Sequence, residues 1–267
     1  MKQNLVAAIS IAALFVTGCA ETNVELDQKN ISNIHRVTVV GPSDPVPMSV
    51  VTQGEVNAQR AVAAAAAIPF AGVLGAAVAG GVAGGIAGEV ARETSKPLND
   101  EVAAEKYSYA AALQDALVTA LKANGYDVST AVVEHSPGRF AEKLDGVGGK
   151  PDLIVDATAL ATCTDVGGGE RAHFRPVVHL QVKLMRPGDT NPIMNKSFVY
   201  DDTIAAPDAF QIKGDPQYDI ADYAALKANI KACLVGIKAS AVPLANAVAS
   251  VVVPQKSAVA ATVAAAK

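Results

Sequence analysis

Hydrophobic and polar positions alternate most regularly between Val177 and Met185. One face carries Val178, Leu180, Val182 and Leu184, and the other carries His179, Gln181 and Lys183. This period of two residues is typical of a half-buried β-strand. Residues 186–189 (Arg-Pro-Gly-Asp) form a turn sequence, and 193–200 is again rich in apolar residues. The pattern therefore predicts an antiparallel hairpin.

The other predicted elements are three strands and two helices. Runs rich in β-branched residues predict strands over 34–40, 126–133 and 152–160. Apolar residues recur at steps of three and four over 107–124 and 219–245, the spacing of helices with one buried face. This order predicts an α+β fold: a mixed sheet of about four to five strands covered by two helices, with an Ala/Gly-rich helical insertion.

The N-terminal residues have the three parts of a secretion signal. Lys2 supplies a positive charge, 5–16 is an apolar run broken by one serine, and Val-Thr-Gly-Cys follows at 16–19. The run is shorter than the about 20 apolar residues that cross a bilayer. The last four residues resemble the lipobox of bacterial lipoproteins, which implies cleavage after Gly18 and attachment of diacylglycerol and palmitate at Cys19. The alternative is an ordinary secretion signal with an incidental cysteine.

This resemblance divides the chain into four parts. Residues 1–18 are the signal peptide, 19–33 the lipidated cysteine and a polar tether, 34–245 a periplasmic α+β domain, and 246–267 a low-complexity tail. Fourteen residues separate Cys19 from Ile34, so the first strand lies within about 50 Å of its membrane. Resemblance to sorted lipoproteins implies that Ala20, which is not aspartate, permits export to the periplasmic face of the outer membrane.

Residues 61–88 contain no charged residue and are rich in alanine and glycine. Gly72, Gly80, Gly84 and Gly88 are spaced by multiples of four, so on a helix they share a face that another backbone can approach closely. The segment resembles the glycine-zipper segments of bacterial envelope proteins. Three interpretations stay open: helix packing within the protein or a homo-oligomer, insertion into or contact with a membrane, and a flexible linker.

Two further cysteines, Cys163 and Cys233, remain once Cys19 carries lipid. Because the periplasm is oxidising, a disulfide between them would tie the end of a strand to the last helix. The alternative is two separate buried thiols, since Cys233 falls on the apolar stripe of the predicted helix.

The remaining features argue against catalytic, cofactor-binding and metal-binding residues. The formal net charge is -4 without a basic cluster, unlike a nucleic-acid interface. The four histidines lack the paired spacing of a zinc site, and Pro151 stands where a phosphate loop requires Ser or Thr. A nucleophile motif such as Gly-x-Ser-x-Gly is absent. Asp201 and Asp202 are interpreted as a solvated strand end rather than a cation site.

The predicted domain also resembles, in its order of elements, the small periplasmic domains of several outer-membrane lipoproteins. These are the curli-secretion type, the activators of penicillin-binding proteins and the auxiliary lipoproteins of envelope transport. Segments 34–40, 120–128 and 152–160 and the hairpin carry the resemblance. It implies a non-enzymatic accessory in envelope assembly, secretion or transport that contacts another envelope protein. The alternatives are a ligand-binding or hydrolytic lipoprotein and a membrane-active oligomer formed through the glycine-zipper segment.

Overall fold

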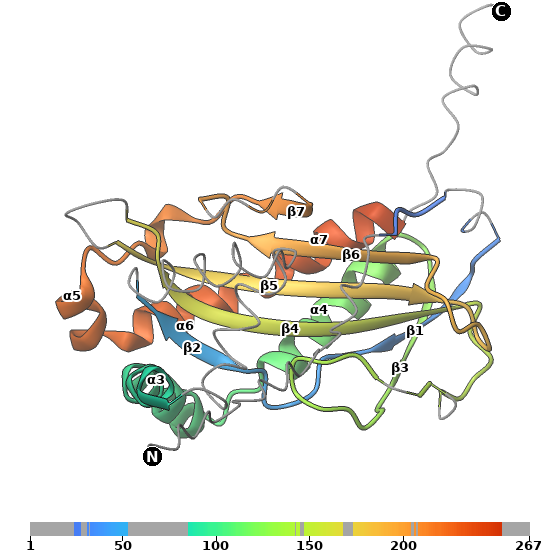
Figure 1. Ribbon diagram of the computed structural model, residues 1–267. Helices are drawn as coiled ribbons and strands as arrows, with labels where there is room; N and C mark the ends of the chain where they lie inside the picture. The colour runs from blue at the N-terminus through green and yellow to red at the C-terminus, as the bar shows by residue number, and fades with distance from the viewer. Residues whose placement is uncertain are drawn as a thin grey trace, which may run out of the picture.

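The computed structural model describes residues 24–27, 31, 33–52, 85–141, 143–144, 147–167, 173–203, 206 and 208–252. They form one mixed seven-stranded sheet with helices packed on one face (Figure 1). The strands are β1 (Arg36–Val40), β2 (Met48–Val51), β3 (Asp127–Ala131), β4 (Leu153–Asp165), β5 (Phe174–Met185), β6 (Met194–Tyr200) and β7 (Ala209–Ile212). The helices are α3 (Gly85–Glu105), α4 (Tyr109–Ala123), α5 (Tyr223–Ala228), α6 (Ile230–Ala239) and α7 (Ala241–Val252), with a 3₁₀ turn, η2, at Pro216–Tyr218.

Strand β4 organises the sheet because it is long enough to pair with two strands along one edge. The sheet order is β3-β1-β4-β5-β6-β7. The first half of β4 pairs in parallel with β1, and Ala161–Thr164 of its second half pairs in parallel with β2. Its other edge pairs with β5 in an antiparallel ladder. β1 and β2 therefore follow one another along a single edge of β4.

Helices α4, α6 and α7 cover the face of the sheet that lies behind it in Figure 1. Helix α4 begins at its N-cap Ser108, whose hydroxyl accepts a hydrogen bond from the backbone N–H of Ala111, a common helix start. Its leucines at 113, 117 and 121 are fully buried. They share one hydrophobic core with the inward side chains of β4, β5 and β6, which alternate with residues on the opposite face. Helix α4 itself packs beside β1, β3 and α7.

The structure confirms the α+β class and gives more strands than the sequence predicts. The β5–β6 hairpin joins Val182 to Lys196 and Leu184 to Met194, within the predicted ranges. The additional strands β2 and β7 have only four residues each, too few to show a period. The predicted helix over 219–245 is three helices, α5, α6 and α7, which break at Asn229 and Ser240.

Most of helix α3 lies in a stretch, 89–105, for which the sequence predicts no element. It contains Pro97 and includes residues 85–88 of the predicted Ala/Gly-rich insertion, so Gly88 lies in this helix. Between 93 and 100 only Ser95 and Leu98 are buried. A buried stripe of two residues, one of them polar, leaves no amphipathic pattern for sequence inspection to detect.

The structure moves both boundaries of the predicted 34–245 domain outward. Within the expected tether, Val24 forms an antiparallel bridge with Asn195 at the start of β6, and Ile31 is completely buried. At the other boundary, α7 continues to Val252, which is buried together with Val248. Residues 246–252, expected in the tail, therefore belong to the folded domain.

The sheet has two ends along the direction of its strands, and each is named here by a feature that lies there. We call the end with the turn between Met185 and Met194 the hairpin end; Val24 and Val252 also lie there, since the Tyr126 hydroxyl donates to the carbonyl of Val252. We call the opposite end the disulfide end; it includes the last residues of β2, β4 and β6 and the first of β5. In Figure 1 the hairpin end is on the right and the disulfide end on the left.

Within the described residues, Ile230–Val252 is apolar and long enough to cross a membrane, by length and composition. It comprises α6 and α7, and 61% of its most apolar window is buried inside the protein. Leu234, Ile237 and Leu244 of this stretch are fully buried in the core. Its apolar character is therefore explained by packing against the sheet.

Candidate functional site

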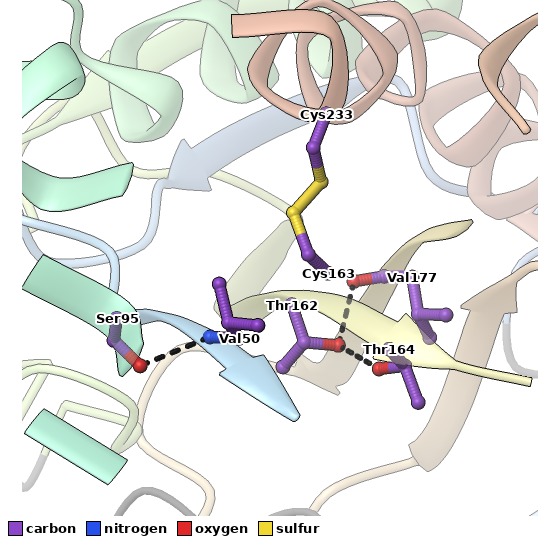
Figure 2. Close-up of a disulfide and its surroundings, with 7 residues drawn as sticks. All are labelled: Val50, Ser95, Thr162, Cys163, Thr164, Val177 and Cys233. Atoms are coloured by element: carbon purple, nitrogen blue, oxygen red, sulfur yellow. Dashed lines mark hydrogen bonds between the residues drawn. A yellow bond between two sulfur atoms is a disulfide. The ribbon is translucent and has the colours of Figure 1, made fainter. Parts of the chain in front are cut away.

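A disulfide joins Cys163 of β4 to Cys233 of α6 (Figure 2). Both residues are fully buried, and their Cα atoms lie 6.2 Å apart, within the usual range for this bond. Of the two alternatives that the sequence left open, the structure has the bonded one. The bond fixes α6 to the sheet at the disulfide end.

Strand β2 lies between this disulfide and α3. Val50 is the register partner of Cys163, and its backbone N–H donates to the Ser95 hydroxyl of α3 at 3.0 Å (Figure 2). The Asn99 side chain donates to the carbonyl of Met48 at 3.4 Å. Helix α3 thus supplies hydrogen bonds to the edge of β2 that a further strand would otherwise complete.

A groove of about 270 Å³ opens beside these elements. It is lined by Val50 of β2, by Glu93, Thr94 and Pro97 of α3, by Tyr223, Leu226 and Lys227 of α5, and by Ile230 of α6. Its apolar side chains are flanked by one acidic and one basic residue, Glu93 and Lys227, both exposed. The Lys227 ammonium lies 4.5 Å from the centre of the Tyr223 ring. This lining suits an apolar side chain accompanied by polar groups.

A charged cluster occupies the neighbouring part of the disulfide end. The guanidinium of Arg175, at the start of β5, contacts both carboxylate oxygens of Asp219 at 2.6 and 2.9 Å. It also lies 3.6 Å from Asp201, and His173 lies 3.1 Å from Asp219. The hydrogen bond that Arg175 donates to the Asp219 carboxylate raises the pKa of the guanidinium above its ordinary value. The cluster links the chain after β6 and η2 to the first residues of β5.

Asp201 differs from the solvated strand end that the sequence predicted. Asp201 is only 1% exposed, and its carboxylate accepts hydrogen bonds from the backbone N–H and the hydroxyl of Thr203. Its φ of 110° lies in a region that residues other than glycine rarely adopt. Only Asp202 is exposed as expected. Sequence inspection missed this because Arg175, which is distant in the chain, reaches Asp201 only through the fold.

The histidines lie in separate surroundings. His135 contacts the carbonyls of Gly41 and Arg139, His35 is exposed before β1, and His173 belongs to the charged cluster. His179 is buried on β5, and desolvation lowers its pKa to about 4. In the described part of the chain, no group of three or more His, Cys, Asp or Glu residues is placed to hold a metal ion.

Several residues singled out by the sequence lie outside the described ranges. These are Gly18 and Cys19 of the lipobox and Gly72, Gly80 and Gly84 of the Ala/Gly-rich segment. Their roles remain predictions. The residues that sequence inspection missed are Ser95, Arg175, Asp219 and those lining the groove. For this end of the domain the sequence offers one signal, the aspartate-rich stretch 201–222.

The chain was also compared with known proteins. No protein-family model, curated protein or solved structure matches it. Its function is therefore inferred from its own residues and geometry.

Proposed function

We propose that this chain is a lipid-anchored accessory protein of the bacterial cell envelope that acts by contacting another envelope protein. The observation that carries the proposal is the buried disulfide between Cys163 and Cys233. Disulfides persist in oxidising compartments such as the periplasm and are rare in the cytosol. Together with the lipobox-like residues 16–19, the disulfide supports export followed by anchoring at Cys19.

The disulfide end offers a surface that suits contact with a partner protein. It combines the groove between α3 and α5 with a rigid base, because the disulfide fixes α6 and the Arg175 cluster fixes the start of β5. A partner segment entering the groove would meet Leu226 and Ile230 between the charges of Glu93 and Lys227. Apolar contacts surrounded by polar groups are typical of sites where proteins dock.

The ligand-binding or hydrolytic alternative has less support at this site. A volume of about 270 Å³ is just below the range of about 300–1,000 Å³ typical of small-molecule pockets. Of the two charged side chains that line it, Lys227 stacks on the ring of Tyr223. The groove therefore suits a docking segment better than an enclosed substrate.

The anchor is tested by labelling cells with a palmitate analogue. The wild-type protein should take up label, and a Cys19→Ser variant should not. The contact surface is tested in the same cells by placing a photo-crosslinking residue at Lys227, beside the groove. A matched probe at Lys122, exposed on α4, is the control.

The proposal expects one discrete crosslinked product from position 227 and none from position 122. Blocking of that product by Glu93→Lys, which reverses an exposed charge at the edge of the groove, would tie it to the lining. Equal products from both positions, or a wild-type protein without lipid label, would contradict the proposal.

A further inference from the structure

The chain is fixed to the fold close to its predicted lipid anchor. Val24 and Asn195 exchange two backbone hydrogen bonds of 3.0 Å each. Glu25 extends this attachment through an ion pair of 3.0 Å with Lys196. These contacts lie at the start of β6, at the hairpin end. The chain therefore leaves the fold toward Cys19 at Val24, at the hairpin end.

Chain length then limits how far the hairpin end lies from the lipid. Four residues separate Cys19 from Val24, so this connection spans at most about 18 Å. Strand β4, by contrast, has 13 residues and extends over about 40 Å. The hairpin end is thus held near the bilayer, whereas the disulfide end lies one sheet length from the attachment point.

The distribution of charge distinguishes the two ends. Residues 201–222, which run between β6 and α5, contain six aspartates and one lysine. Arg175 offsets one of these aspartates by pairing with Asp219. The hairpin turn 186–193 contains one arginine and one aspartate. Because anionic lipid headgroups repel negative charge within about a Debye length, they disfavour the disulfide end at the membrane.

We infer that the mature protein stands on the lipid surface with its hairpin end against the headgroups and its disulfide end directed away from them. This inference rests on the proposed lipid anchor at Cys19. The short attachment at Val24 brings the hairpin end to the bilayer, and the aspartates of 201–222 keep the molecule from lying flat. The groove then faces a partner about 40 Å from the membrane surface.

The direction of α3 extends this inference to the Ala/Gly-rich segment. Ser95 lies beside Val50 and Asn99 beside Met48, so α3 runs toward the hairpin end. Its first residue, Gly85, is about 15 Å of helix before Ser95, and Thr52 directly follows β2. Both attachments of residues 53–84 are therefore at the disulfide end. The orientation therefore directs these two attachments, at Thr52 and Gly85, away from the anchoring bilayer.

Single tryptophans can test the orientation, because the natural chain has none. The full acylated protein is inserted into vesicles of phosphatidylcholine and phosphatidylglycerol that carry a dansyl-labelled lipid. Energy transfer to dansyl is measured from Thr190→Trp in the hairpin turn and from Ala224→Trp on α5. Both positions are exposed, and thermal unfolding is measured to show that both variants keep the wild-type fold.

We expect several-fold stronger transfer from the tryptophan at position 190 than from that at 224. Equal transfer from both would show that the sheet lies flat and would overturn the orientation while leaving the anchor intact. Stronger transfer from position 224 would also overturn it. If the protein from cells lacks acyl chains and does not float with the vesicles, the anchor and the orientation are both refuted.

Discussion

Ser95 of α3 accepts a hydrogen bond from the backbone N–H of Val50 at 3.0 Å, joining a helix to the edge of β2. The Ser95 residue is buried. An unpaired buried N–H costs about 1–3 kcal/mol, so we expect Ser95→Ala to destabilise the protein by about that amount. The Val50 amide should also exchange faster with solvent, as measured by NMR. Lys96→Ala, at the exposed neighbouring position, is the control and should leave the Val50 exchange rate unchanged.

The disulfide should contribute much of the stability of the domain. Its cysteines are 70 residues apart, and a bond closing a loop of that length is worth about 4 kcal/mol in the chain-entropy model. The double variant Cys163→Ala/Cys233→Ala should lose about this much in urea unfolding. A reductant should destabilise the wild type similarly and leave the variant unaffected. An effect of reductant on the variant would show that another thiol is responsible.

At Gly236 of α6, alanine should destabilise the protein, although helices ordinarily favour alanine over glycine. Replacing a helical glycine by alanine ordinarily gains up to about 1 kcal/mol. Here a Cβ would lie 2.5 Å from Pro176 and 2.9 Å from Tyr218. We therefore expect Gly236→Ala to lower the free energy of unfolding by about 1–3 kcal/mol. Gly148→Ala, where a Cβ would meet nothing within 4 Å, should change it little.

His179 should make stability depend on pH. Burial lowers its pKa in the folded state to about 4, from 6.5. Between these values the unfolded chain binds a proton that the folded protein does not, so stability falls as pH decreases from about 6.5 to about 4. The full loss is about 3 kcal/mol. In His179→Gln this slope should disappear from pH-dependent unfolding curves, and a slope equal to that of the wild type would refute the assignment.

Glu105 titrates in a lower range and serves as a comparison. Hydrogen bonds from Lys238 and Lys231 lower its pKa to about 2, from 4.5. Its contribution to stability is therefore present above pH 4.5 and is lost as pH falls toward 2. Glu105→Gln should change the unfolding curve only in that lower range, which separates it from the effect of His179.

Arg175 should be required for the structure of the disulfide end. Arg175→Met removes both contacts to Asp219 and leaves the buried Asp201 facing no guanidinium. We expect a loss of about 2 kcal/mol in thermal or urea unfolding. Arg175→Lys keeps the positive charge without the bidentate contact to Asp219, so it should lose less stability than Arg175→Met. Arg186→Met, in the exposed hairpin turn, is the control and should stay near the wild type.

Features that a local pattern of residues expresses could be predicted from the amino-acid chain alone. The alternation of Val178, Leu180 and Val182 sets one face of β5 against the core, and the leucines of 107–124 set the buried face of α4, so both elements were predicted. The lipobox-like residues were found in the same way. Each of these signals is contained in a few residues or in a repeated step of two, three or four.

The tertiary structure decided the features that depend on residues distant in the chain. Strand β2 forms because β4 offers it an edge and α3 covers its other side, although its four residues are too few to show a period. Asp201 becomes buried because Arg175, 26 positions earlier, reaches it across the sheet. The attachment of Val24 to β6 spans more than 170 residues. Such contacts gain their energy from burial and pairing across the fold, and no local pattern of residue types records which distant groups will meet.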